Sequence, residues 1–273
     1  MESLLIKLVA FVLLLQKSNV AGQSLLIPNV PYGSDPEQIM DLYLPSSDTT
    51  RVTKVVVLIH GGAWGGGQKA DMLEFIPFIQ RDFPDYCIAN MDYRLGTHES
   101  PGFPKQLDDI SLALTYLSNT FTQPVTFALF GTSAGAHLSM LYAYQTSDNL
   151  VKIVVSHVGP GDLTDPSYVE NTLYDELFYS LVGPCHFSVC PDLYNATSPI
   201  TYATSVSPPT IGFYGTLDLL VPSTQMPILR EKLTEFNVTN KFTVYPGGHG
   251  WNWSAANKED LRVQITQFFN DHW

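Results

Sequence analysis

Apolar and polar residues form two patterns along this chain, one typical of buried strands and the other of amphipathic helices. The run KVVVLI at 54–59 is apolar almost throughout, as expected of a strand that is covered on both faces. Leu107, Ile110, Leu114 and Leu117 recur instead at helical spacing. Segments of the two kinds alternate, which predicts an α/β fold with a mostly parallel sheet and helices on both faces.

The predicted elements begin at residue 54 and continue to the end of the chain. Strands are expected at 54–59, 86–92, 125–130, 153–157, 210–214 and 241–245. Helices are expected at 72–81, where Pro77 disturbs the pattern, and at 107–117, 134–144, 228–236 and 258–269. Because no repeat or low-complexity tract divides the series, we expect residues 23–273 to form one α/β domain.

One stretch breaks this alternation. Between the strands at 153–157 and 210–214 lie roughly fifty residues rich in Pro, Tyr and Asp, long for a connection within a compact sheet. Such excursions are usually functional, so we expect an insertion at about 159–209 that forms a lid or a pocket wall. A surface insertion without function is the alternative.

The N-terminal segment has the features of a secretory signal. Its apolar run at 8–15 is too short to span a bilayer comfortably, and small residues follow at Ala21 and Gly22. We therefore expect a signal peptide at 1–22, cut after Gly22, and a protein that is secreted or held in the lumen of the secretory pathway. An uncleaved N-terminal anchor is the alternative.

Export to an oxidising compartment bears on the three cysteines. Cys185 and Cys190 stand five residues apart in the loop-like segment CHFSVC, which predicts a disulfide between them. Cys87 lies in a predicted strand and is expected to be a buried free thiol.

Three N-x-S/T sequons also agree with export. We expect glycan at Asn195 and Asn237, which fall in the insertion and in a surface loop. Asn252 stands between Trp251 and Trp253, and we expect it to be empty or sparsely occupied.

Composition narrows the classes of partner. The 273 residues carry a formal net charge of −12, with 45% hydrophobic and 15% charged residues. This acidity argues against nucleic acid and against anionic membrane surfaces, because both attract basic proteins. We expect no stable membrane insertion of the mature chain, and the sequence predicts no oligomeric state.

The segment FALFGTSAGAHL carries the strongest chemical signal. Its residues GTSAG, at 131–135, fit the G-x-S-x-G pattern and stand between a predicted strand and a predicted helix, as this motif requires. The sharp turn exposes the Ser133 hydroxyl at the helix N-terminus, where the helix dipole favours negative charge. Ser133 is therefore the predicted nucleophile.

A serine nucleophile needs a base, and the base needs a carboxylate that orients it. His249, in YPGGHGW between the last predicted strand and helix, is the expected base. Asp218, in GTLDLLVP after the strand at 210–214, is the expected acid, with Asp162 as the second candidate. The order Ser133, Asp218, His249 is the chain order of α/β-hydrolases. Among the other histidines, His137 is expected to face away from the serine, and His157 to pack in the core or at the pocket rim.

The segment HGGAWGGGQK at 60–69 places five glycines within seven residues after a strand. It fits neither the phosphate-binding G-x-x-x-x-G-K-[S/T] pattern nor a dinucleotide-binding fingerprint. It does fit an oxyanion loop, whose backbone N–H groups hold a developing negative oxygen. We expect these donors to be Gly62 and Ala63, together with Ala134 of the elbow.

Several of these segments together resemble a known family. HGGAW, MDYRL, FPKQLDDI, GTSAGAHL and the spacing from GTLDLLVP to GGHGW are similar to carboxylesterases of the hormone-sensitive-lipase-like and BD-FAE-like groups of α/β-hydrolases. The resemblance implies hydrolysis of a small-molecule ester without a cofactor or metal. GTSAGAHL is also similar to kynurenine formamidase and isoprenylcysteine methylesterase. An arylformamidase-type amide hydrolase and a non-catalytic binding protein are thus the alternatives.

Aromatic residues near these motifs are expected to wall the substrate pocket. They are Trp64, Trp251 and Trp253 beside the catalytic segments, and Tyr168, Tyr174, Phe178 and Tyr179 in the insertion.

Overall fold

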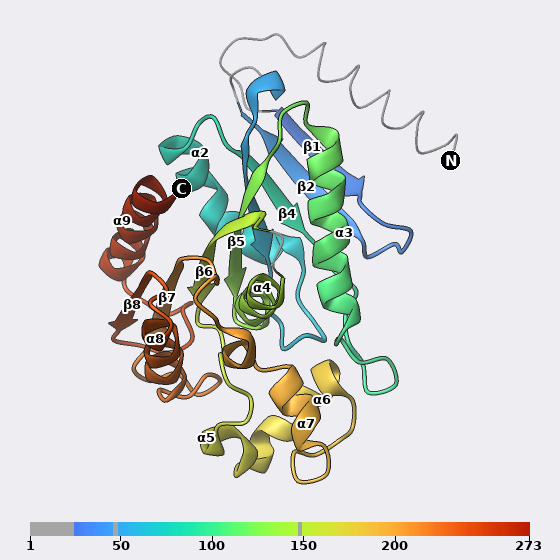
Figure 1. Cartoon of the computed structure of the whole chain (residues 1–273), viewed down its shortest axis with the longest axis vertical. Coiled ribbons are helices and arrows are strands. Elements are labelled where there is room, and N and C mark those ends of the chain that lie inside the picture. The colour runs from blue at the N-terminus through green and yellow to red at the C-terminus, as the bar shows by residue number, and fades with distance from the viewer. Residues whose placement is uncertain (1–24, 46–48, 147–148) are drawn as a thin grey trace.

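The centre of the molecule is an eight-stranded sheet with the order β1-β2-β4-β3-β5-β6-β7-β8 (Figure 1). The computed structural model describes residues 25–45, 49–146 and 149–273, so the predicted signal peptide at 1–22 lies outside the described residues. The strands are β1 (Leu25–Pro31), β2 (Ile39–Leu44), β3 (Lys54–Ile59), β4 (Cys87–Met91), β5 (Thr126–Thr132), β6 (Val151–His157), β7 (Thr210–Gly215) and β8 (Asn240–Tyr245). Neighbouring strands from β4 to β8 pair in parallel, whereas β1 and β2 pair antiparallel at one edge.

The first two strands were not predicted. In β1, Pro28 and an irregular register after Ile27 obscure the pattern, and most of the strand is exposed or half-buried. In β2, Met40, Leu42 and Leu44 are buried while Asp41 and Tyr43 between them are half-buried. That alternation is the signature of a strand with one covered face, and it could have been recognised.

Helices cover both faces of the sheet, as predicted. One apolar cluster joins the sheet to α3 (Lys105–Thr120), α4 (Ala134–Gln145) and α8 (Gln225–Glu235), and a second joins it to α2 (Ile76–Asp82) and α9 (Ala255–His272). Along β3, Val55, Val57 and Ile59 contribute to the first cluster, whereas Val56 and Leu58 contribute to the second. The uninterrupted apolar run at 54–59 is thus explained by burial on both faces. No helix in the described part of the chain combines the length and apolarity needed to cross a membrane.

The single helix expected at 72–81 proved to be two elements. A 3₁₀ segment, η2 (Lys69–Phe75), leads directly into α2. Pro77 stands in the first turn of α2, where its missing N–H costs nothing, and therefore starts the helix instead of disturbing it.

Residues 158–209 form a helical insertion between β6 and β7, at the bottom of Figure 1. Its elements are α5 (Pro166–Val169), η3 (Thr172–Tyr174), α6 (Asp175–Val182), α7 (Pro191–Ala196) and η4 (Pro199–Tyr202).

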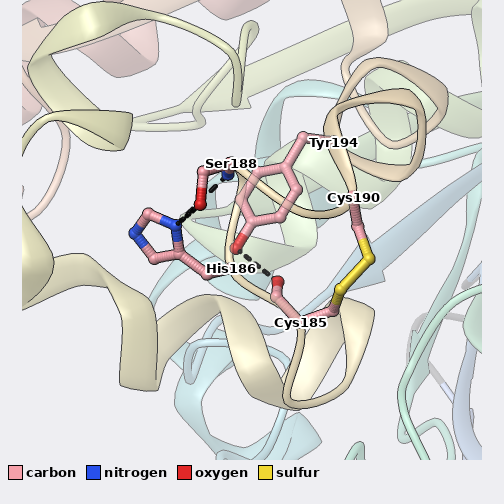
Figure 2. Close-up of a disulfide and its surroundings, with 5 residues drawn as sticks. All are labelled: Cys185, His186, Ser188, Cys190 and Tyr194. Carbon is pink, nitrogen blue, oxygen red and sulfur yellow. Dashed lines mark hydrogen bonds between the residues drawn. A yellow bond between two sulfur atoms is a disulfide. The ribbon is translucent and has the colours of Figure 1, made fainter.

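A disulfide between Cys185 and Cys190 closes a short turn of this insertion, as Figure 2 shows. The Tyr194 hydroxyl donates a hydrogen bond of 3.1 Å to the Cys185 carbonyl and ties α7 to that turn. Cys87 is buried and free. Both cysteine predictions are therefore confirmed.

Candidate active site

Ser133 lies on a tight elbow between β5 and α4. Its backbone has φ 55° and ψ −120°, and its N–H donates to the His157 carbonyl over 2.8 Å. A side chain at Gly135 would bring its Cβ within 2.1 Å of the Ile59 carbonyl oxygen, so the elbow can pack against β3 only with glycine there. The strained turn presents the Ser133 side chain at the carboxyl end of the sheet.

The loops after β7 and β8 bring Asp218 and His249 to this serine. His249 Nε2 lies 2.8 Å from Ser133 Oγ, and His249 Nδ1 lies 2.7 Å from Asp218 Oδ2. A carboxylate only accepts hydrogen bonds, so the imidazole proton is on Nδ1 and Nε2 accepts from the serine hydroxyl. The three predicted residues therefore form one continuous hydrogen-bonded chain.

Burial and backbone amides hold the acid of this chain. The Asp218 side chain is only 1% exposed, and its Oδ1 accepts from the N–H groups of Leu220 and Val221 at 2.8 and 2.9 Å. These two supporting N–H groups were not predicted. The second candidate acid, Asp162, does not contact His249, since its Oδ1 accepts from the amide and hydroxyl of Thr164 within the insertion.

The glycine-rich loop after β3 lies beside the serine. Gly62, Ala63 and Trp64 have φ values of 117°, 48° and 62°, and the N–H groups of Gly65 and Gly66 fold back to the Gly62 carbonyl. The N–H groups of Gly62, Ala63 and Ala134 donate to no acceptor among the described residues. Gly62 and Ala63 also line the cavity that contains Ser133. Two of the three predicted donors, Gly62 and Ala63, thus border the cavity with N–H groups that no described residue accepts.

A cavity of about 430 Å³ opens above Ser133 and His249. Its aromatic walls are Trp64, Tyr168, Tyr174, Phe178 and Trp251. Among the described residues that line it, Asp71 and Glu74 are the only carboxylates, and no lysine or arginine is present. The cavity is therefore apolar and aromatic with a weakly acidic rim. In the same described ranges, no three His, Cys, Asp or Glu side chains gather as a metal-binding group.

Two aromatic residues that we expected in this wall lie elsewhere. Trp253 is buried behind the loop, where its indole N–H donates to the Gly248 carbonyl and its ring packs on His157. Tyr179 packs edge-on against His98. Sequence proximity to His249 did not reveal that Trp251 lines the cavity while Trp253, two residues on, is buried outside it.

The remaining histidines of the catalytic segments are buried. His157 lines the cavity, as expected of a rim residue, and burial together with the nearby His249 lowers its pKa to about 3. Burial also lowers the pKa of His60, which stacks on Tyr93. His137 faces away from Ser133, as predicted, and burial lowers its pKa to about 4. All three rings are thus neutral at pH 7.

Known proteins share this architecture. The solved structure of a truncated carbohydrate esterase from gut microbiota aligns with a TM-score of 0.77 at 20% identity, covering 93% of this chain and 97% of that one. Inhibited esterase B from Lactobacillus rhamnosis aligns with a TM-score of 0.70 at 19% identity, covering 99% and 94%. The predicted α/β-hydrolase fold is confirmed by these likenesses.

Sequence comparison also finds relatives that are named as esterases. Esterase LipC of Mycobacterium tuberculosis is 27% identical over 241 residues, which cover 82% of this chain and 59% of LipC. Isoprenylcysteine alpha-carbonyl methylesterase ICME of Arabidopsis thaliana is 24% identical over 241 residues, with 80% and 55% covered. The chain therefore spans less than two thirds of the length of these relatives.

A family model gives the most direct assignment. Residues 40–233 match the BD-FAE model, a range that contains the glycine-rich loop, the elbow with Ser133, the insertion and Asp218. The resemblance inferred from the motifs is confirmed, and the chain belongs to the BD-FAE family of α/β-hydrolases.

Proposed function

We propose that this protein is a secreted serine esterase that cleaves small carboxylic esters. The observation that carries the proposal is the hydrogen-bonded chain from Ser133 Oγ through His249 to Asp218 at the floor of an aromatic cavity. A non-catalytic protein on this fold would have no need of a buried acid, an oriented base and a strained nucleophile together.

In the proposed reaction, Ser133 Oγ attacks the ester carbonyl while His249 Nε2 takes its proton. The tetrahedral oxyanion accepts hydrogen bonds from the N–H groups of Gly62, Ala63 and Ala134. His249, now positively charged beside Asp218, returns the proton to the leaving alcohol, and an acyl-enzyme remains. Water deprotonated by His249 then attacks the acyl-enzyme, which releases the carboxylic acid and restores Ser133.

The cavity lining indicates which esters would fit. Aromatic side chains provide apolar contact area for an acyl or aryl group, and none of the described residues that line the cavity is a lysine or arginine that could pair with an anionic substrate. We therefore infer a preference for uncharged esters. Relatives named as esterases and as isoprenylcysteine methylesterases support ester over amide hydrolysis.

Three features support the proposal of secretion. The predicted signal peptide precedes a domain with a disulfide in its insertion and with exposed side chains at all three sequons. Expression of the full chain in eukaryotic cells, followed by N-terminal sequencing of the protein recovered from the medium, should give a chain that begins at Gln23. Retention in the membrane fraction with an intact N-terminus would favour the anchor.

A substrate panel tests the enzymatic proposal. We expect wild-type protein to hydrolyse 4-nitrophenyl esters, and Ser133→Ala to be folded but inactive. An uncharged methyl butyrate should be cleaved faster than monomethyl succinate, which carries a carboxylate. N-formylkynurenine tests the amide-hydrolase alternative directly. Retained activity in Ser133→Ala, or turnover of the formamide in preference to every ester, would contradict the proposal.

A further inference from the structure

His137 occupies a position that the proposed reaction does not explain. It is the fourth residue of α4, directly after the elbow, and its side chain is fully buried. Its Nε2 is 2.7 Å from the Thr197 carbonyl oxygen in the insertion, and its Nδ1 is 3.1 Å from Trp64 Nε1 in the glycine-rich loop. One imidazole thus joins three segments that meet at the catalytic pocket.

The two partners determine where the proton lies on this ring. A carbonyl oxygen can only accept, so His137 Nε2 carries the hydrogen and donates it to Thr197. An indole N–H can only donate, so His137 Nδ1 is bare and accepts from Trp64. Both hydrogen bonds require the same neutral tautomer, and neither ring nitrogen is free to act on a substrate.

The backbone of Trp64 itself has an energetically unfavourable conformation. Its φ of 62° follows the positive φ values of Gly62 and Ala63. A bulky residue is rarely found in this left-handed region, and it remains there only where its surroundings hold it. The Trp64 carbonyl accepts from the Gly96 N–H at 2.8 Å and from Gln106 Nε2 at 2.7 Å. Its side chain is held by the hydrogen bond to His137 and by ring contacts with His137 and Phe178.

We propose that His137 is a positioning residue of the oxyanion loop. By accepting from the Trp64 indole, it holds the 62–64 segment in its left-handed conformation and keeps the N–H groups of Gly62 and Ala63 directed at the substrate oxygen. The inference rests on the proposed esterase function. It assigns a role in transition-state binding to a side chain that touches neither substrate nor nucleophile.

Two substitutions separate the two hydrogen bonds of this ring. In His137→Asn, the amide oxygen takes the place of Nδ1 and can still accept from Trp64, whereas the contact with Thr197 is lost. In His137→Gln, the amide nitrogen reaches the place of Nε2 and can still donate to Thr197, whereas Trp64 loses its acceptor. Trp64→Phe removes the indole donor from the other side while keeping an aromatic ring.

The matched control is Tyr144→Phe. Tyr144 lies near the far end of α4, and its hydroxyl is 2.8 Å from Thr210 Oγ1 in a buried hydrogen bond. The control therefore weakens the same helix without changing the oxyanion loop. We expect it to lower the melting temperature and leave kcat unchanged.

The test measures kcat and KM for 4-nitrophenyl acetate, and the inhibition constants of a trifluoromethyl ketone and its methyl ketone counterpart. We expect His137→Gln to lower kcat about 100-fold, the lower end for loss of one oxyanion donor, with little change in KM. Trp64→Phe should lower kcat to a similar extent, and its KM should rise as well because the Trp64 ring also lines the cavity. The trifluoromethyl ketone, which forms an oxyanion on the serine, should bind correspondingly more weakly, and the methyl ketone should not. His137→Asn should retain most of the activity.

Equal losses of kcat in His137→Asn and His137→Gln would overturn the inference. So would losses of kcat that parallel the fall in melting temperature across all variants, Tyr144→Phe included. Either result in an active wild-type protein leaves the esterase proposal intact. A wild-type protein that hydrolyses no ester overturns the proposed function itself.

Discussion

The sheet with its flanking helices and the insertion at 158–209 are built in different ways. The sheet and its helices enclose two apolar clusters, and long helices such as α3 and α9 repeat apolar residues at helical spacing. In the insertion, no helix in the described residues is longer than the eight residues of α6, too short to be stable alone. The three residues of the catalytic chain all lie on loops of the sheet, whereas Tyr168, Tyr174 and Phe178 of the insertion form cavity wall. In the proposed enzyme, the sheet region therefore carries the chemistry, and the insertion shapes the substrate cavity.

A few polar contacts, some of them buried, hold the insertion in place. Gln225 of α8 accepts from the Gly161 and Asp162 N–H groups at 2.8 and 2.9 Å and donates back to the Asp165 carboxylate. The Tyr174 hydroxyl donates to the Leu219 carbonyl at 3.0 Å. The Gln225 contacts involve none of Ser133, Asp218 and His249. Changes in the sheet loops should therefore lower kcat, whereas changes in the insertion that spare the Asp218 loop should mainly alter KM.

The largest expected effect follows from Asp218→Asn. The amide can donate toward His249 Nδ1, so it favours the wrong imidazole tautomer, and kcat should fall by about 10⁴. Asp162→Asn is the matched control, because it changes an acidic side chain of the insertion that does not contact His249. Steady-state kinetics would contradict the assignment if Asp162→Asn were the slower enzyme.

Loss of the Cys185–Cys190 disulfide tests the role given to the insertion. A disulfide that closes a fifteen-residue loop stabilises a protein by about 3 kcal/mol. This bond joins residues only five apart, so its loss should lower the unfolding free energy by less than that. Tyr194 packs on Phe178 of the cavity wall, so the loosened turn should raise KM while kcat changes little. Kinetics of Cys185→Ser/Cys190→Ser, with Cys87→Ser as the control, measure this. A loss confined to kcat would show that the insertion carries chemistry.

Acidification should destabilise the sheet region through its buried histidines. In the unfolded chain His137 and His157 take up protons near pH 6.5, whereas in the folded protein their pKa values are about 4 and about 3. The unfolded state therefore binds more protons below pH 6.5. Each histidine should remove up to about 1.4 kcal/mol of unfolding free energy per pH unit, and the share of His137 should level off below about pH 4.

Urea unfolding at pH 7 and pH 5 measures this slope. His157→Asn should reduce the dependence of the unfolding free energy on pH. An unfolding free energy that stays constant or rises as the pH falls would show that these rings are protonated in the folded protein.

The smallest effect concerns glycosylation beside the pocket. All three sequon asparagines are exposed, but Asn252 Oδ1 accepts from the Gly248 N–H at 2.9 Å, within the loop that carries His249. We expect glycan at Asn195 and Asn237 and little at Asn252 in protein from eukaryotic cells. Glycopeptide mass spectrometry measures occupancy, and full occupancy at Asn252 in active enzyme would show that its side chain is not needed by that loop.

Predictability from sequence depended on whether a feature leaves a pattern in its own segment of the chain. The parallel strands could be predicted because burial on both faces leaves continuous apolar runs such as 54–59, and the elbow could be predicted because only glycines fit around Ser133. The edge strand β1 could not, since Pro28 and an irregular register hide its period. The directions of Trp251 and Trp253 and the contacts of His137 could not either, because they depend on which distant loop meets each side chain.

The central claim is that Ser133 is the nucleophile of this site. Intact-mass spectrometry after treatment with a fluorophosphonate measures this directly, with peptide mapping to locate the adduct. The account predicts one adduct per chain, located on Ser133, formed much more slowly in His249→Ala and absent in Ser133→Ala. Labelling at another residue, or labelling of Ser133→Ala to the same extent as wild type, would contradict it.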